Sequence, residues 1–187
     1  MAGALRQLVT VMDRMRLTKI AATLVLSLPL AAAGSSDRKQ IEAVYRQYET
    51  SFEMKDFQAL ESLFAPAYTS DVDGRSVGHD DAVAAVRSQS RKAGAPVRCR
   101  FKLGRLTVDG SGASVPVSEA GHYRLRALDK SLHVLRYARE RQDHLVLVDG
   151  KWRIDASRRG EGGARYWVDR KPASADKVRK VFGPEAL

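Results

Sequence analysis

Two adjacent residues near the end of the chain could carry acid–base chemistry. Asp143 and His144 precede the apolar run Leu145–Val148, in a stretch whose composition predicts a strand. A carboxylate or imidazole enclosed by apolar residues shifts its pKa toward the working pH and can then move protons. Neighbours in a regular strand point to opposite faces, so at most one of the two can be catalytic. The competing interpretation of Asp143 is an ion pair with Arg139 or Arg141 at a strand edge.

Four aromatic residues are candidates for binding a small molecule beside such a group. Tyr45 and Tyr48 could donate hydrogen bonds from their hydroxyl groups to a ligand carbonyl. Tyr123 and Trp152 could form apolar walls of a pocket. All four also fit plain core packing, because Tyr45 and Tyr48 belong to an apolar helix stripe and the other two lie in predicted strands.

The remaining residues indicate neither a metal site nor a covalent nucleophile. The chain has four His and one Cys, and no two His stand at the helical i, i+4 spacing or as a His-x-His pair. The sequence contains no Gly-x-Ser-x-Gly turn and no glycine-rich phosphate loop, so acyl transfer and nucleotide hydrolysis lack support. Cys99 alternates with apolar residues and should be a buried, inert thiol. We expect no metal and no cofactor.

The first part of the chain after residue 34 predicts helices. Asp37 and Gln40 form a capping pattern. Apolar residues then recur at helical spacing, at Ile41, Val44, Tyr45, Tyr48 and Phe52. A shorter helix is expected from Asp56, and the Asp73-Gly74 turn precedes a third helix over about 79–92.

From Val97 the apolar pattern changes to period two, which is typical of strands with one solvated face. Tight-turn residues at 109–112, 129–130 and 149–150 divide this region into long strands. Helices followed by antiparallel strands predict an α+β fold, with the helices packed on one side of a curled sheet.

Three parts of the chain together resemble a known family. They are the opening helix, the segment DFQALESLFAPAY at 56–68 before the Asp73-Gly74 turn, and the closing hairpin LVLVDGKWRID at 145–155. These residues resemble the nuclear transport factor 2-like superfamily in its SnoaL-like branch, over about residues 37–157. The resemblance implies a cone-shaped α+β barrel, in which three N-terminal helices pack in a strongly curved antiparallel sheet with a pocket at its wide end.

The same resemblance bears on function without deciding it. Relatives often carry an acid near the position of Asp143. Pockets of this superfamily serve isomerases, dehydratases, cyclases and hydrolases, but also non-catalytic ligand binders and dimerisation modules. The outer face of the sheet commonly pairs in the relatives, so the resemblance implies a homodimer as one arrangement.

Residues 1–33 have the pattern of a signal peptide. Arg14, Arg16 and Lys19 precede the uncharged apolar run Ile20–Ala33, which ends in small residues that fit a cleavage site. This run of 14 residues is short for a spanning helix, which needs roughly 20. We therefore expect residues 1–33 to be removed and the chain to be periplasmic or secreted, with an uncleaved membrane anchor as the alternative.

The chain is strongly basic. Its 187 residues carry a net charge of +10, of which +7 remains on residues 34–187. Arginines in the strand region predict a basic outer sheet face, formed by several of Arg98, Arg100, Arg105, Arg124, Arg126, Arg136, Arg139, Arg141, Arg158 and Arg159. Such a face attracts polyanions, but export and the lack of interleaved aromatic residues argue against nucleic acid; a solvated face is the alternative. Residues 158–187 should form a basic, partly flexible extension with at most one short helix.

Three functional hypotheses follow. The leading one is an exported domain, 34–157, that binds a small, largely apolar ligand in the cone pocket. The second is an acid–base isomerase, dehydratase or cyclase-type enzyme that uses Asp143 or His144. The third is an interaction or dimerisation module at the cell envelope, in contact with a membrane only if the leader is uncleaved.

Overall fold

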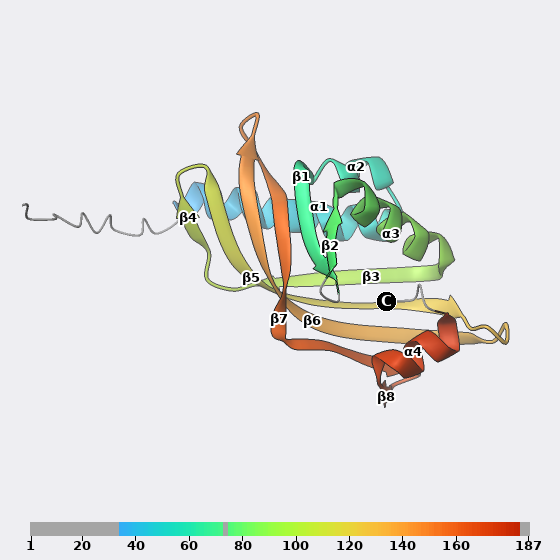
Figure 1. Ribbon diagram of the computed structural model, residues 1–187. Coiled ribbons are helices and arrows are strands. Elements are labelled where there is room, and N and C mark those ends of the chain that lie inside the picture. The colour runs from blue at the N-terminus through green and yellow to red at the C-terminus, as the bar shows by residue number, and fades with distance from the viewer. Residues whose placement is uncertain (1–33, 73–74, 184–187) are drawn as a thin grey trace, which may run out of the picture.

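The computed structural model describes residues 34–72 and 75–183, so the predicted signal peptide and the Asp73-Gly74 turn lie outside the described residues. Helices come first and long strands follow, as the change of apolar period predicted (Figure 1). The elements are α1 (Ser35–Met54), α2 (Phe57–Glu61), β1 (Phe64–Val72), β2 (Arg75–Gly78), α3 (His79–Lys92), β3 (Ala93–Leu103), β4 (Thr107–Asp109), β5 (Gly112–Arg126), β6 (Leu132–Val148), β7 (Lys151–Val168), β8 (Lys171–Ala173) and α4 (Ala175–Phe182).

All the described strands belong to a single curled sheet. Its strand order is β2-β1-β7-β6-β5-β3, with β4 paired to β5 and β8 to β7. The pairing ends at β2 and β3, so the sheet curls without closing into a barrel (Figure 1). The predicted antiparallel pairing holds except between β1 and β7, which are parallel. A parallel pair needs a long crossover, and here the whole chain from β2 to β6 lies between the two strands.

Strand β7 contains a bulge where we expected a flexible segment after Ser157. The register of β7 with β6 shifts between Arg159 and Ala164. Residues 160–163 take up the difference, and Gly163 has a positive φ of 63°. Such a bulge bends its strand and favours glycine where φ is positive. The glycine-rich sequence therefore forms a bend within a paired strand, at the point where β7 changes direction (Figure 1).

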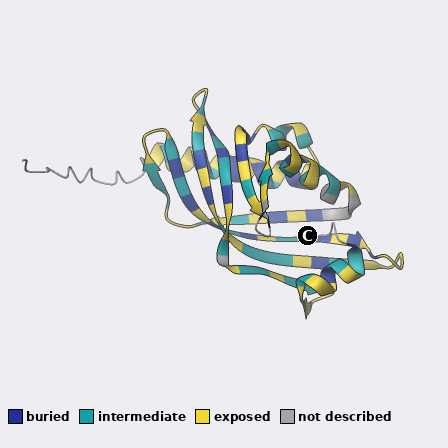
Figure 2. Cartoon of the chain, in the orientation of Figure 1, coloured by how far each residue is buried: buried dark blue, intermediate teal, exposed yellow. Residues whose placement is uncertain are grey.

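Helix α1 has buried residues along most of its length (Figure 2). It begins at Ser35, and no side chain caps it, so the predicted Asp37–Gln40 capping pattern is wrong. The predicted stripe is confirmed, because the buried residues of α1 are Ile41, Val44, Tyr45, Tyr48, Ser51 and Phe52. Within the described part of the chain, no helix combines the length and the apolarity needed to cross a bilayer.

The described C-terminal residues form β8 and α4, which follow β7. Helix α4 is the one short helix expected in this extension; the Ser174 side chain accepts a hydrogen bond from the Lys177 backbone N–H at its start. Val178 on its inner side is fully buried. The Leu128 N–H donates to the carbonyl of Val181 at 2.9 Å, which ties the end of α4 to the β5–β6 turn.

Candidate functional site

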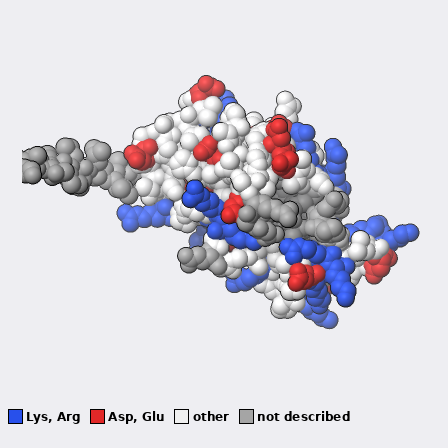
Figure 3. All heavy atoms as spheres, in the orientation of Figure 1, with Lys and Arg blue, Asp and Glu red and all other residues white. Residues whose placement is uncertain are grey.

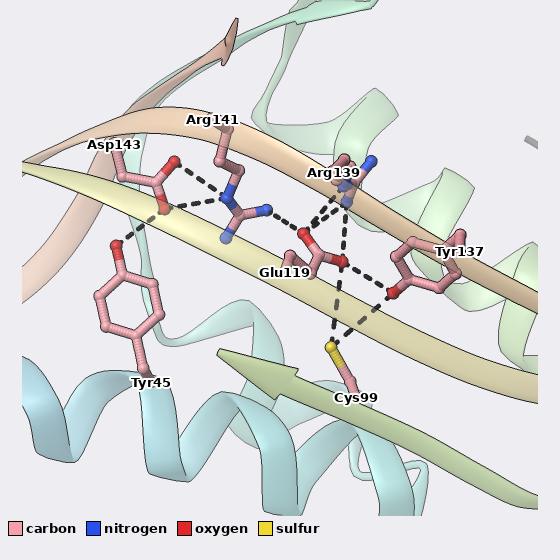
Figure 4. Close-up of polar contacts among 7 residues, drawn as sticks. All are labelled: Tyr45, Cys99, Glu119, Tyr137, Arg139, Arg141 and Asp143. Carbon is pink, nitrogen blue, oxygen red and sulfur yellow. Dashed lines mark hydrogen bonds and ion pairs between the residues drawn. The ribbon is translucent and has the colours of Figure 1, made fainter. Parts of the chain in front are cut away.

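A connected set of polar side chains lies on the inner face of the sheet. Four of them stand at alternate positions of β6 and therefore share one face of that strand. The remaining members come from neighbouring elements and point toward this row (Figure 4). We call this set the inner network; it comprises Tyr45 of α1, Cys99 of β3, Glu119 of β5, and Tyr137, Arg139, Arg141 and Asp143 of β6.

Asp143 occupies one end of the inner network and is fully buried. The hydroxyl of Tyr45 donates a hydrogen bond to its Oδ2 at 2.8 Å. The Nε of Arg141 donates to the same oxygen at 3.1 Å and lies 3.0 Å from Oδ1. Within the described residues, Oδ1 accepts no hydrogen bond. The carboxylate is thus paired with Arg141 of its own strand and hydrogen-bonded by Tyr45 of α1.

Glu119 accepts most of the hydrogen bonds of the inner network. Arg139 donates to it from Nε at 2.9 Å and from Nη2 at 3.0 Å, and Arg141 donates from Nη1 at 2.8 Å. The hydroxyl of Tyr137 adds a bond of 2.7 Å. Burial alone raises the pKa of a carboxyl, but the two guanidinium groups outweigh it and lower the pKa of Glu119 to about 2. Glu119 is therefore ionised although its side chain is only 2% exposed.

The two tyrosines and the cysteine of the inner network are neutral. Burial raises the pKa of Tyr45, Tyr137 and Cys99 well above their ordinary values, and the carboxylate of Asp143 or Glu119 acts in the same direction. Two carboxylates and two guanidinium groups consequently balance each other. Cys99 is buried beside Glu119, where a thiolate would be repelled, which supports the expected inert thiol.

A glycine makes room for part of this arrangement. Gly121 lies between Cys99 and Tyr137 in the register of β3, β5 and β6. A Cβ atom at Gly121 would lie 2.4 Å from the Tyr137 ring and 2.7 Å from its hydroxyl oxygen. Only glycine lets the ring cross β5 and bring its hydroxyl to Glu119.

A cavity of about 320 Å³ opens beside the inner network. Its walls come from β1, β2, α3, β6, β7 and α4, together with one residue of α1. Its aromatic lining consists of Tyr48, Phe64, Tyr68 and Tyr166. Its charged lining consists of Arg139, Arg141, Arg158, Arg159 and Arg179, with the acids Asp71 and Glu140. Arg139 and Arg141 therefore belong to both the inner network and the cavity wall.

The structure separates the two acid–base candidates. Asp143 points inward, paired with Arg141 as the competing interpretation proposed, although in the middle of the sheet rather than at an edge. His144 lies on the other face with its side chain 47% exposed, and its Nδ1 lies 3.4 Å from Asp155. Neither residue lines the cavity.

The four aromatic candidates also lie apart. Tyr48 lines the cavity, where its ring packs edge-on against Phe64. The hydroxyl of Tyr45 is directed to Asp143, and Tyr123 and Trp152 are buried members of the core. Only one of the four candidates therefore meets the cavity.

Comparison with known proteins identifies the family of this chain. The SnoaL-like domain family matches residues 34–158. The chain belongs to the SnoaL-like family. No curated protein sequence matches it.

Solved structures share the fold of this SnoaL-like domain at low sequence identity. A conserved protein from Planctomyces limnophilus is 15% identical with a TM-score of 0.59, over 66% of this chain and 94% of that one. A putative scytalone dehydratase from Novosphingobium aromaticivorans is 16% identical with a TM-score of 0.55, over 66% and 82%. A ketosteroid isomerase-like protein from Erwinia carotovora atroseptica is 17% identical with a TM-score of 0.53, over 67% and 95%. These likenesses support the predicted fold alone.

Glu119, the central acid of the SnoaL-like domain, was not among the predicted site residues. Glu119 occupies the inward row of β5 after Val115 and Val117, both fully buried. A charged residue in an otherwise apolar alternating row was the available signal, because such a residue needs buried partners. The expected outer position is also wrong for Arg139 and Arg141, which lie on the inner face as those partners.

The described residues of the SnoaL-like domain contain no group of three or more His, Cys, Asp or Glu side chains arranged to hold a metal ion. The carboxylates of Asp143 and Glu119 are instead engaged by guanidinium groups.

The pKa of Glu119 predicts a specific loss of stability in acid. The ordinary value of 4.5 applies to the unfolded chain and about 2 to the folded one. The ionised form therefore stabilises the fold fully above about pH 4.5, and this contribution disappears as the pH falls toward 2. Denaturant unfolding should show that the unfolding free energy of wild type falls steeply between these pH values. Glu119→Gln should remove this fall. Glu140→Gln, at an exposed carboxyl, should keep the slope; an unchanged slope in the Glu119 variant would contradict the assignment.

The paired state of Asp143 predicts that Asp143→Asn destabilises the protein. The substitution leaves the Arg141 guanidinium with only one of its two buried carboxylates, and breaking a buried ion pair costs about 3 kcal/mol. Denaturant unfolding at neutral pH measures the loss. Asp155→Asn, which removes the partly exposed partner of His144, should cost less than about 1 kcal/mol. Equal stability of the Asp143 variant and wild type would refute the structural role.

Proposed function

We propose that this SnoaL-like domain binds a small molecule with an apolar body and a carboxylate group in the cavity beside the inner network. The proposal keeps the small ligand of the leading hypothesis and adds an anionic group to it. The observation that carries it is the state of Arg139. Two nitrogens of this guanidinium are held by buried Glu119, while 40% of the side chain remains exposed at the cavity wall.

A guanidinium fixed in this way is suited to a carboxylate. Free arginine side chains lose much rotational freedom when they bind, whereas Arg139 is already ordered by Glu119. Guanidinium groups bind planar carboxylates through paired hydrogen bonds, which gives direction as well as affinity. Arg158 extends the basic lining on β7, so that an anion would meet more than one cation.

The rest of the cavity suits an apolar body. Tyr48, Phe64, Tyr68 and Tyr166 supply aromatic surface, and Ala82 and Val86 of α3 supply small apolar groups. Rings and small aliphatic side chains around a few directed polar groups are the usual composition of a small-molecule site. The volume of about 320 Å³ lies at the small end of such sites.

The positions of Asp143 and His144 favour binding over acid–base catalysis by either group. A general base must come within hydrogen-bond reach of the proton that it removes. Asp143 is fully buried outside the cavity lining and paired with Arg141, and His144 lies on the opposite face. The dehydratase and isomerase names among the fold neighbours refer to those proteins and assign no activity to this chain.

A pair of probes with the same ring tests the ligand class. Naphthoate should bind at least about tenfold more tightly than uncharged naphthylmethanol by isothermal titration calorimetry, because only naphthoate pairs with a guanidinium. Ala85→Trp should abolish binding of naphthoate, since Ala85 lines the cavity. Ala84→Trp places the same bulk on the neighbouring surface of α3 and should leave binding intact.

Two results would count against this function. Equal affinity for the two probes would exclude the carboxylate, and equal binding by the Ala85 and Ala84 variants would exclude the cavity.

Arg139→Lys, which keeps the charge but loses the fork of the guanidinium, should reduce the preference for naphthoate.

We also propose export to the periplasm or the medium, on the signal-peptide pattern of residues 1–33. Intact-mass measurement of protein from the native host should give an N-terminus at Gly34 or close to it. Protein that retains residues 1–33 in the membrane fraction would instead support an uncleaved anchor. The homodimer stays a prediction.

A further inference from the structure

One end of the molecule carries most of its net charge. Residues 124–133 and 165–183 together contain nine Lys or Arg and three Asp, a net charge of +6, against +7 for all of residues 34–187. The fold brings these two stretches together. The Leu128 N–H donates to the carbonyl of Val181, and the Asp169 N–H donates to the carbonyl of Val134, both at 2.9 Å. Lys and Arg side chains gather where α4 lies in Figure 1 (Figure 3). We call these two stretches the basic end.

The basic end also exposes two leucines. Leu128 is 70% exposed and Leu132 57%, on either side of the β5–β6 turn. Large apolar side chains exposed this close together leave hydrophobic surface in water, and burial of such surface elsewhere would be favourable. Leu128 adjoins Val181 and the lysines of α4 along a groove of about 760 Å³.

The acids of this region are engaged locally, whereas two of its lysines, Lys177 and Lys180, are not. Asp129 accepts the Ser131 N–H at 2.9 Å, and Asp169 accepts the Val134 N–H at 2.9 Å and pairs with His133. Within the described residues, Lys177 and Lys180 form no ion pair although both line the groove. Both lysines are exposed, so their charges face solvent in the groove that Leu128 also lines.

We propose that the basic end binds the surface of a bilayer that contains anionic phospholipids. Leu128 and Leu132 enter the boundary between headgroups and acyl chains, and Lys177 and Lys180 meet the phosphates. Basic residues around exposed apolar side chains are the combination that attaches proteins to anionic bilayers. A nucleic acid would use the charges but would leave the leucines in water. The attachment differs from the alternative of an uncleaved anchor, because it lies in the described domain and does not require residues 1–33.

Vesicle co-sedimentation tests this attachment. The full chain, with the same N-terminus in every variant as checked by mass, is mixed with vesicles of phosphatidylcholine or of an equimolar mixture with phosphatidylglycerol. Wild type should bind the mixed vesicles more tightly, and salt should weaken the binding by screening. Lys177→Glu with Lys180→Glu should weaken it at least about 25-fold, since each lysine near an anionic surface is worth roughly fivefold. Leu128→Ser with Leu132→Ser should weaken it at least about tenfold, because both substitutions remove apolar surface that enters the bilayer.

A matched control changes the net charge equally elsewhere. Lys102→Glu with Lys151→Glu alters exposed lysines in β3 and at the β6–β7 turn, and should bind like wild type apart from a small nonspecific loss. Equal binding to both vesicle types, or an equal loss in the control, would overturn the proposal. A third result would also overturn it: tight binding to a DNA duplex, retained by the leucine variant, with no binding to vesicles. That result would assign the basic end to a polyanion.

Discussion

The ionised carboxylate of Glu119 is the constraint around which the inner face of the sheet is arranged. A charge so deeply buried persists only where donors surround it, and here Arg139, Arg141 and Tyr137 supply them from β6. A buried ion pair adds little net stability compared with apolar residues of the same size, but loss of one partner is costly. The network therefore acts chiefly to fix how β5 lies against β6. Two of its members, Arg139 and Arg141, also form part of the cavity wall.

The same side chain connects structure and proposed function. Arg139 satisfies the buried acid and borders the cavity, so the position of a bound anion would depend on Glu119 without any contact between the two. The fold neighbours include proteins named as enzymes and others with no named activity. In such a fold the side chains at the cavity, rather than the sheet, decide what is bound.

The helices and turns could be predicted because local patterns determine them. The stripe of α1 and the ends of the long strands follow from apolar spacing and turn residues. The inner network could not be predicted, because Tyr45 meets Asp143 only after the chain folds back across 98 positions. The inward face of Arg139 was equally hidden, because alternation alone does not say which face of a strand is covered.

The bulge at residues 160–163 divides β7 into two sections whose pairing with β6 is set independently, residues 151–159 before it and 164–168 after it. Between the two sections the chain advances five residues along β7 while β6 advances two. The section after the bulge pairs with the part of β6 that carries Tyr137 and Arg139, and it leads into β8 and α4. The bend therefore sets the direction in which the basic end projects from the row of side chains that encloses Glu119.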